Sequence, residues 1–235
     1  MALLLFDVDG TLVRPLGLGR KSFLAALETV LGAPVDPAPF SYDGLLDTEI
    51  ARRTLSSLNT DPDPPVLERL LAAYVGFLSA EPFPPSEQCR CDGLPAALER
   101  CLQRGHDLAL LTGNVRGGAL VKLRAAGLDA FFRNGGSALL GAFGEDAADR
   151  PGLVPVALDR CRRHFGKEFP PDSVWIVGDS ERDIRAARTA GVRCAAVATG
   201  HTPLEVLEAL APNVLLSSLG DPGALCDAVE EGGMP

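Results

Sequence analysis

The chain has 235 residues, of which 46% are hydrophobic and 23% are charged, a composition typical of a globular protein with one large or two modest domains. Its formal net charge of −9 argues against a nucleic-acid-binding surface, although a local field in a cleft can still attract an anion. No stretch approaches the roughly 20 apolar residues of a membrane span. The short apolar run near the start lacks the basic region of a signal peptide. We therefore expect a cytoplasmic protein that binds neither nucleic acid nor a membrane.

The first predicted element is the apolar run 2–6, which ends in Asp7-Val8-Asp9-Gly10-Thr11. A short apolar run closed by a turn signal is typical of a strand buried on both faces of a parallel sheet. The period-2 geometry of a strand lets Asp7 and Asp9 point to the same side. Ligands of open α/β sheets bind outside the carboxyl ends of the strands, so these two acids indicate a cation site, a nucleophile, or both.

Apolar residues then recur at helical spacing in three segments, which are separated by a proline-rich break and a polar loop. These predicted helices cover residues 21–31, 48–58 and 65–78. The stretch 81–88 contains three prolines and is predicted to be a linker. We therefore expect an all-helical cap domain over residues 15–86, inserted into the rest of the chain.

From Gly93 onward, predicted helices alternate with short apolar strands. The predicted helices are 94–103, 118–126, 153–165, 184–190 and 203–210, and the predicted strands are 107–111, 173–177, 192–198 and 214–216. This alternation predicts an α/β fold with a doubly wound, Rossmann-like parallel sheet. The predicted catalytic core consists of residues 1–14 and 87–235.

Six cysteines, at positions 89, 91, 101, 161, 194 and 226, are expected to be free, buried thiols of a reducing compartment. The pair Cys89 and Cys91 is too closely spaced for an ordinary zinc knuckle and has no second pair to complete one.

Three predicted strands are followed by side chains that could react or bind a ligand: Asp7 and Asp9, Thr112, and Asp179. Parallel strands bring their carboxyl ends to one edge of the sheet, so these groups could converge. Acids alone would repel a phosphate monoester, and a divalent cation would invert the local field. Carboxylate oxygens favour Mg²⁺, for which Asp179 and the nearby Asp183 would be further ligands.

The segment after the second strand could bind an anion. Thr112 offers a hydroxyl, and Gly113 and Asn114 offer backbone amides ahead of the next helix. Arg150 could supply the positive charge that stabilises a transferring phosphoryl group. One carboxylate of the first pair could attack phosphorus while the other moves the proton of the leaving oxygen.

These residues resemble the motifs of the haloacid dehalogenase-like hydrolase superfamily. Asp7-Val8-Asp9-Gly10-Thr11 is similar to the first motif, Leu111-Thr112-Gly113-Asn114 to the second, and Gly178-Asp179 with Asp183 to the fourth. The resemblance implies that Asp7 is the nucleophile and Asp9 the general acid/base. It also implies that Asp7, the backbone carbonyl of Asp9 and Asp179 bind Mg²⁺, with Asp183 in support.

The chain departs from that family at the third motif, where the usual Lys before Pro is replaced by Arg150-Pro151. Lys167 is the nearest lysine, but it follows the predicted helix instead of preceding it. We therefore assign the role of the third motif to Arg150. Arginine can bind phosphate in a bidentate manner, although it is not equivalent to lysine.

The resemblance implies a phosphatase of the phosphoglycolate phosphatase-like branch, acting on a small phosphorylated metabolite. Separately, we expect a monomer or a weak homodimer. One alternative is a phosphomutase of the β-phosphoglucomutase type, which shares the motifs. A haloacid dehalogenase is disfavoured because it needs neither Mg²⁺ nor an acid at position 9. Outside the enzymes, a receiver-like or binding domain would need neither that acid nor the helical insertion. Within the insertion, the loop 42–47 is expected to reach over the active site.

Overall fold

The computed structural model describes residues 1–14, 16–36, 40, 42, 44–133 and 135–232. Its centre is a six-stranded sheet with the strand order β3-β2-β1-β4-β5-β6, in which every neighbouring pair is parallel. The strands are β1 (Leu3–Phe6), β2 (Asp107–Leu111), β3 (Gly141–Ala142), β4 (Val174–Gly178), β5 (Arg193–Val197) and β6 (Val214–Leu216). The predicted α/β fold with a doubly wound parallel sheet is confirmed. The strand order reverses direction between β1 and β4, and such a switch point is the usual ligand crevice of this architecture.

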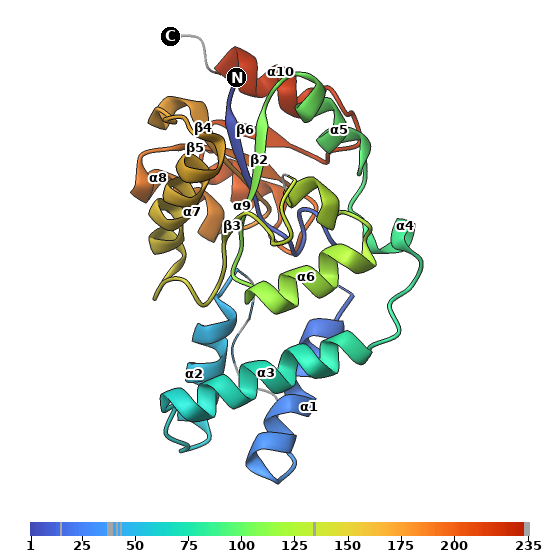
Figure 1. The fold of residues 1–235 in the computed structure, drawn as a ribbon, viewed down its shortest axis with the longest axis vertical. Helices are drawn as coiled ribbons and strands as arrows, with labels where there is room; N and C mark the ends of the chain where they lie inside the picture. The colour runs from blue at the N-terminus through green and yellow to red at the C-terminus, as the bar shows by residue number, and fades with distance from the viewer. Residues whose placement is uncertain (15, 37–39, 41, 43, 134, 233–235) are drawn as a thin grey trace.

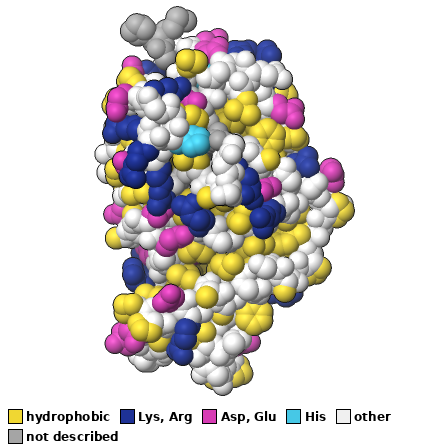
Figure 2. All heavy atoms as spheres, in the orientation of Figure 1, with side chains coloured by type: hydrophobic (Ala, Val, Ile, Leu, Met, Phe, Trp, Pro, Cys, Tyr) yellow, Lys and Arg dark blue, Asp and Glu magenta, His cyan; other side chains and the backbone are white. Residues whose placement is uncertain are grey.

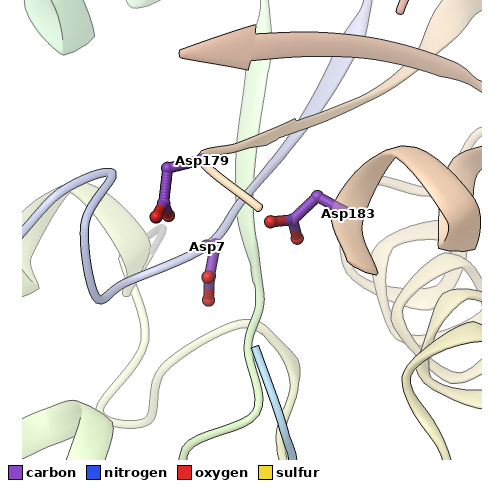
Figure 3. Close-up of side chains that lie close together, drawn as sticks. All are labelled: Asp7, Asp179 and Asp183. Atoms are coloured by element: carbon purple, nitrogen blue, oxygen red, sulfur yellow. The ribbon is translucent and has the colours of Figure 1, made fainter. Parts of the chain in front are cut away.

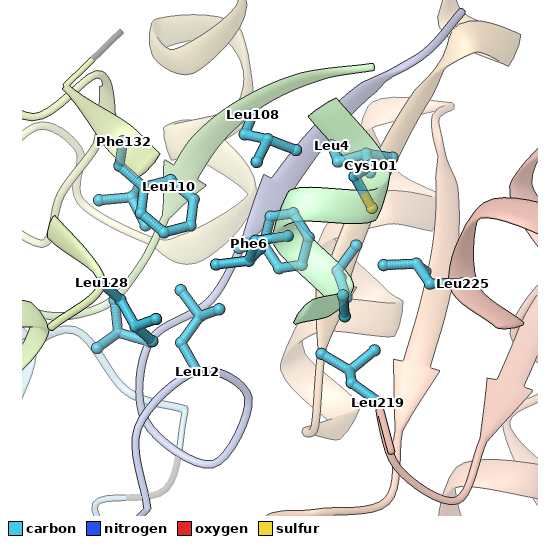
Figure 4. Close-up of a cluster of buried hydrophobic side chains, with 14 of the residues drawn as sticks. Leu4, Phe6, Leu12, Cys101, Leu108, Leu110, Leu128, Phe132, Leu219 and Leu225 are labelled. Atoms are coloured by element: carbon cyan, nitrogen blue, oxygen red, sulfur yellow. The ribbon is translucent and has the colours of Figure 1, made fainter. Parts of the chain in front are cut away.

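The sheet is covered by helices on both faces, because successive side chains of each buried strand point in opposite directions. Leu4 and Phe6 of β1 belong to the core that also contains residues of α5 (Ala96–Gln103), α6 (Arg116–Ala125) and α10 (Ala224–Gly232). Figure 4 shows this cluster. Leu3 and Leu5 belong to the opposite core, with α7 (Arg150–Phe165), α8 (Glu181–Ala190) and α9 (Leu204–Ala209).

Three helices between β1 and β2 form a separate bundle, called here the three-helix segment. They are α1 (Leu18–Leu31), α2 (Asp47–Ser57) and α3 (Pro64–Ala80). They share their own buried core, which includes Phe23, Leu55, Leu70 and Tyr74. In Figure 1 this segment lies at the end of the molecule opposite α10, with α3 running beside α6. The short helix α4 (Ser86–Cys89) overlaps the end of the stretch 81–88, which was predicted to be a linker.

Several element boundaries differ from the predictions for identifiable reasons. Helix α8 begins three residues earlier than predicted because Ser180 and Asp183 form a capping box at its first turn. Helix α7 begins at Arg150 because the Asp149 side chain accepts a hydrogen bond from the amide of Gly152. The two-residue strand β3 and helix α10 were not predicted, and neither was the short 3₁₀ helix η1 (Asp129–Phe132).

The surface shows a mixture of charges. In Figure 2, Lys and Arg side chains are interspersed with acidic and apolar ones on the face shown. Among the helices of the described residues, none combines the length and apolarity needed to cross a membrane. The six cysteines are all buried and free, as expected.

Candidate active site

Three carboxylates meet where β1 and β4 end. Asp7 follows β1 directly and Asp179 follows β4, and the two strands are paired through Phe6 and Val177. Asp183 comes from the first turn of α8. One carboxylate oxygen from each acid lies within 4.8 Å of the others, and all three side chains are buried. Figure 3 shows the carboxylates of Asp7, Asp179 and Asp183 grouped around a common point.

Arg150, the first residue of α7, bridges two of these acids. Its Nη2 lies 2.9 Å from Asp7 Oδ2 and 2.5 Å from Asp183 Oδ1, and its Nε donates to the same Asp183 oxygen at 2.9 Å. The guanidinium is 4% exposed. The other Asp183 oxygen accepts hydrogen bonds from the amide and hydroxyl of Ser180. Arg150 thus occupies the position next to the expected nucleophile, and its fork geometry allows it to contact two carboxylates at once.

One guanidinium does not balance three buried carboxylates, and the pKa values reflect this excess of negative charge. Burial raises the pKa of Asp7 to about 6; Arg150 opposes this change, while Asp183 and Asp9 add to it. Burial, together with the charges of Asp7 and Asp183, raises the pKa of Asp179 to about 8. A hard divalent cation would relieve this repulsion, and a cluster of carboxylate oxygens is the donor set that Mg²⁺ prefers. The residues present therefore fit a divalent metal.

Asp179 is held in a narrow space that only glycines allow. A Cβ atom at Gly200 would lie 1.6 Å from Asp179 Oδ2, and one at Gly10 would lie 2.4 Å from the same oxygen. The hydroxyl of Thr11 donates to Asp179 Oδ1 at 2.9 Å. The backbone thus closes around this carboxylate, which fixes where its oxygens lie relative to Asp7.

The carboxylate of Asp9 points to different partners from that of Asp7. Its Oδ2 accepts from Asn114 Nδ2 at 2.8 Å and from Lys122 Nζ at 2.6 Å. The Asp9 side chain is 41% exposed and it lines the cavity described below. The two acids of the first motif are therefore paired with different cations, Arg150 for Asp7 and Lys122 for Asp9.

Sequence reasoning did not identify Lys122, which lies on α6. Burial alone would lower the pKa of Lys122, but Asp9, Tyr74 and Asp47 outweigh this effect and raise it. The available signal was its spacing: Lys122 lies eight residues, or about two helical turns, after Asn114. Lys167, the other lysine considered, pairs with Asp107 and lies away from the acids.

The segment that was predicted to bind phosphate lies beside Asp9. Thr112 is fully buried, and its hydroxyl accepts hydrogen bonds from the amide and the side chain of Asn114 at 3.3 and 2.9 Å. A hydroxyl that accepts two hydrogen bonds can still donate its own proton. Gly113 and Asn114 line the cavity, whereas Asp183 and Thr112 are fully buried and are not among its lining residues. A role of these groups in phosphate binding stays a prediction.

A cavity of about 560 Å³ opens over the acids, between the sheet edge and the three-helix segment. Asp7, Asp9, Asp179, Asn114 and Arg150 line the side formed by the sheet. The opposite side is mainly apolar or aromatic and includes Phe23, Leu45, Ile50, Tyr74, Leu78 and Phe83. A concave site with a few convergent polar groups and perturbed pKa values is typical of an active site.

The start of α2 is hydrogen-bonded to the loops at the strand ends. The amide of Asp47 donates to the Gly113 carbonyl at 2.8 Å, and Asp47 Oδ2 accepts from the amide of Val115 at 2.8 Å. The Thr48 hydroxyl donates to the carbonyl of Gly144 at 2.7 Å. Within the loop expected to reach the site, Tyr42, Gly44, Leu45 and Asp47 line the cavity, while Asp43 lies outside the described residues.

Comparisons with known proteins find relatives that align with most of the chain. A family model described as HAD-hydrolase-like matches residues 150–222. The chain is 26% identical to the pyrophosphatase PpaX of Halalkalibacterium halodurans, with 92% of this chain and 93% of that protein covered. It is 27% identical to phosphoglycolate phosphatase 1 of Pseudomonas aeruginosa, with 93% of this chain and 77% of that protein covered.

Solved structures share the whole fold. The β-phosphoglucomutase of Clostridium difficile superposes with a TM-score of 0.70 at 16% identity, covering 98% of both chains. CbbY of Rhodobacter sphaeroides, solved in complex with phosphate, has a TM-score of 0.69 at 23% identity, covering 95% of this chain and 97% of that one. The doubly wound sheet, the acids at its switch point and the curated relatives together indicate a phosphatase-type hydrolase with an α/β fold. The chain is thus similar to haloacid dehalogenase-like hydrolases, through the family model over residues 150–222 and through curated phosphatases at 26% and 27% identity.

Proposed function

We propose that this chain is a Mg²⁺-dependent phosphatase that hydrolyses a small phosphorylated metabolite through an aspartyl-phosphate intermediate on Asp7. The observation that carries the proposal is the pairing of Asp7 with Arg150, at 2.9 Å, inside a buried acid cluster that opens onto a cavity. This arrangement holds one carboxylate next to a fixed positive charge, where a transferring phosphoryl group needs compensation.

The proposed reaction has two balanced steps. First, an Asp7 carboxylate oxygen attacks phosphorus, the bond from phosphorus to the ester oxygen breaks, and the carboxyl group of Asp9 gives its proton to that leaving oxygen. In the second step, a water molecule attacks the same phosphorus atom while the Asp9 carboxylate takes its proton. The bond from phosphorus to Asp7 then breaks, which releases inorganic phosphate and restores both acids.

Several residues have supporting roles in this proposal. Arg150, the hydroxyl of Thr112, and the amides of Gly113 and Asn114 bind the phosphoryl oxygens. Asp7, the backbone carbonyl of Asp9 and Asp179 would hold Mg²⁺, and Asp183 would support it through its contact with Arg150. The bound cation would supply the positive charge that lets a phosphate dianion approach the carboxylates.

We also propose that residues 15–86 act as a cap over a core formed by residues 1–14 and 87–235. The hydrogen bonds from the start of α2 to the Gly113 and Gly144 loops support this assignment, as does the apolar wall that the three-helix segment contributes to the cavity. Closure over the site would exclude bulk water and select leaving groups by their size. Residue 15, residues 37–39, and residues 41 and 43 lie outside the described part of this segment.

Hydrolysis is favoured over the alternative phosphomutase activity. The relatives that align over more than nine-tenths of this chain carry the names of a pyrophosphatase and a phosphoglycolate phosphatase, whereas the phosphoglucomutase likeness is one of fold. The net charge of −9 and the buried, free cysteines support a cytoplasmic enzyme that acts on a small molecule. We expect a monomer or a weak homodimer.

The test is hydrolysis of p-nitrophenyl phosphate by the purified protein with Mg²⁺. Activity should be abolished by Asp7→Asn and suppressed by EDTA, while the exposed Asp61→Asn is the matched control and should retain it. After acid quenching of the wild-type reaction, mass spectrometry should find phosphate on the peptide that contains Asp7. Wild-type activity in Asp7→Asn would rule out the mechanism. Isomerisation of a hexose phosphate without net release of phosphate would instead indicate the phosphomutase.

A further inference from the structure

Lys122 lines the cavity, and the proposed mechanism assigns no role to it. Its side chain is 11% exposed, and its ammonium lies 2.6 Å from Asp9 Oδ2. It also donates to Asn114 Oδ1 at 2.6 Å. Because an ammonium group can only donate, these contacts fix Asn114 with its oxygen toward Lys122 and its NH₂ group toward Asp9 and Thr112.

The three side chains therefore form a closed triangle. Asp9 Oδ2 receives one hydrogen bond from Lys122 and a second from Asn114 Nδ2, while Lys122 and Asn114 also bond to each other. Two donors on one oxygen fix the rotation of the carboxylate. With Oδ2 occupied in this way, Asp9 Oδ1 is the oxygen left to exchange a proton with a molecule in the cavity.

A further neighbour of the ammonium comes from the three-helix segment. Tyr74 on α3 is 3% exposed, and its hydroxyl lies close enough to Lys122 for the charge of Lys122 to lower the pKa of Tyr74, against the larger effect of burial. Gly19, at the start of α1, also packs here, since a Cβ atom at this position would lie 3.5 Å from Lys122 Nζ and 3.6 Å from the Tyr74 hydroxyl. Two oxygens of the core, from Asp9 and Asn114, thus accept from the ammonium, and the Tyr74 hydroxyl of the three-helix segment lies nearby.

Lys122 does not duplicate Arg150. Arg150 contacts Asp7 and Asp183, whereas the contacts of Lys122 are with Asp9, Asn114 and Tyr74. The two cations therefore divide the two acids of the first motif between them. One stands beside the proposed nucleophile and the other beside the proposed proton carrier.

We propose that Lys122 is a positioning residue that keeps the Asp9 carboxylate in the orientation needed for proton transfer. Tyr74 completes the surroundings of the Lys122 ammonium only when the three-helix segment is packed against the core. This inference rests on the proposed phosphatase function. It assigns to α6 and α3 a part in the chemistry, because a displacement of about 1 Å in a reacting group can reduce a rate by as much as a hundredfold.

The test compares two esters of similar shape, phenyl phosphate and p-nitrophenyl phosphate. Phenolate is the poorer leaving group and needs a proton, whereas p-nitrophenolate leaves without one. In Lys122→Met, kcat/KM for phenyl phosphate should fall by about 10- to 100-fold, within the range of general acid catalysis. The value for p-nitrophenyl phosphate should fall by about threefold or less. A side chain with a merely structural role would change both values by the same factor.

Two further variants keep the test decisive. Tyr74→Phe removes only a hydroxyl and keeps the ring in its core, so it tests the surroundings of Lys122 even where Lys122→Met fails to fold. It should lower kcat/KM for phenyl phosphate selectively, by about 3- to 10-fold. Lys21→Met, at an exposed lysine of α1, is the matched control and should leave both values unchanged. Equal losses for the two esters, or no loss for either, in the folded variants would overturn the inference. An active Asp7→Asn would refute the phosphatase mechanism instead.

Discussion

Replacing Arg150 by methionine tests how the buried charges are balanced. Methionine keeps much of the aliphatic volume but leaves Asp7 and Asp183, which are 7% and 0% exposed, without their guanidinium partner. Removing one member of a buried ion pair costs about 3–5 kcal/mol because the other charge stays buried and unpaired. For a chain of this length each kcal/mol changes the melting temperature by about 2–4 °C. We therefore expect Arg150→Met to melt about 6–20 °C below the wild type at pH 7.5 in EDTA.

The difference in melting temperature between Arg150→Met and the wild type should decrease under two conditions. At pH 5 it should be smaller because Asp7, whose pKa is already raised to about 6 in the presence of Arg150, is then protonated and no longer needs a cation. Saturating Mg²⁺ should stabilise the variant more than the wild type, since the cation would replace part of the missing positive charge. Catalysis should fall by at least about a hundredfold in kcat, which is typical when a fixed charge is removed from a transition-state site.

The matched control is Arg163→Met, a substitution of the same type on the same helix. Arg163 is 74% exposed and pairs with Asp159 one turn away, and exposed pairs of this kind contribute about 0–1 kcal/mol. Thermal melting followed by circular dichroism would measure both variants. Equal melting temperatures for Arg150→Met and Arg163→Met at pH 7.5 would show that Arg150 does not balance the acid cluster.

Two further predictions concern Asp47 and the glycines. Burial raises the pKa of Asp47 from 3.8 to about 7, so the folded state binds this proton more tightly than the unfolded chain and stability falls as the pH rises from about 4 to 7. Asp47→Asn should remove that loss, up to about 4 kcal/mol at about 1.4 kcal/mol per pKa unit, and less where cavity water screens the charge. Urea unfolding should show a gain in stability for the variant at both pH 5 and pH 8, and the gain should be clearly larger at pH 8. Gly200→Ala should displace Asp179, because its Cβ would lie 1.6 Å from Oδ2, and should raise the Mg²⁺ concentration needed for half-maximal activity by at least about tenfold. Gly76→Ala, in open space on α3, should instead stabilise the protein by up to about 1 kcal/mol with unchanged Mg²⁺ dependence, and equal Mg²⁺ dependence in the two variants would contradict the reasoning.

The sequence by itself was enough to locate the strand-end acids. Asp7 and Asp179 directly follow apolar runs, and in a parallel sheet the end of a buried strand determines where the next residue lies. Arg150 was instead assigned through the likeness of Arg150-Pro151 to the third motif, and the structure places it at the start of α7, after the Asp149 cap. These are local patterns, and the topology of a doubly wound sheet converts them into proximity. Strand β3, by contrast, was missed because two residues are too few for any period.

Only the tertiary structure decided where Lys122 goes. A lysine on a helix is ordinarily a solvated residue, and its spacing from Asn114 does not by itself show that it is buried. It is buried because α3 packs against α6 and brings Tyr74 over it, while the strand end brings Asp9 to the same place. Burial of a charge depends on partners that are distant in sequence, here 48 and 113 residues away. The sequence shows where strands end and where helices begin, but only the tertiary structure shows which charged side chains pair.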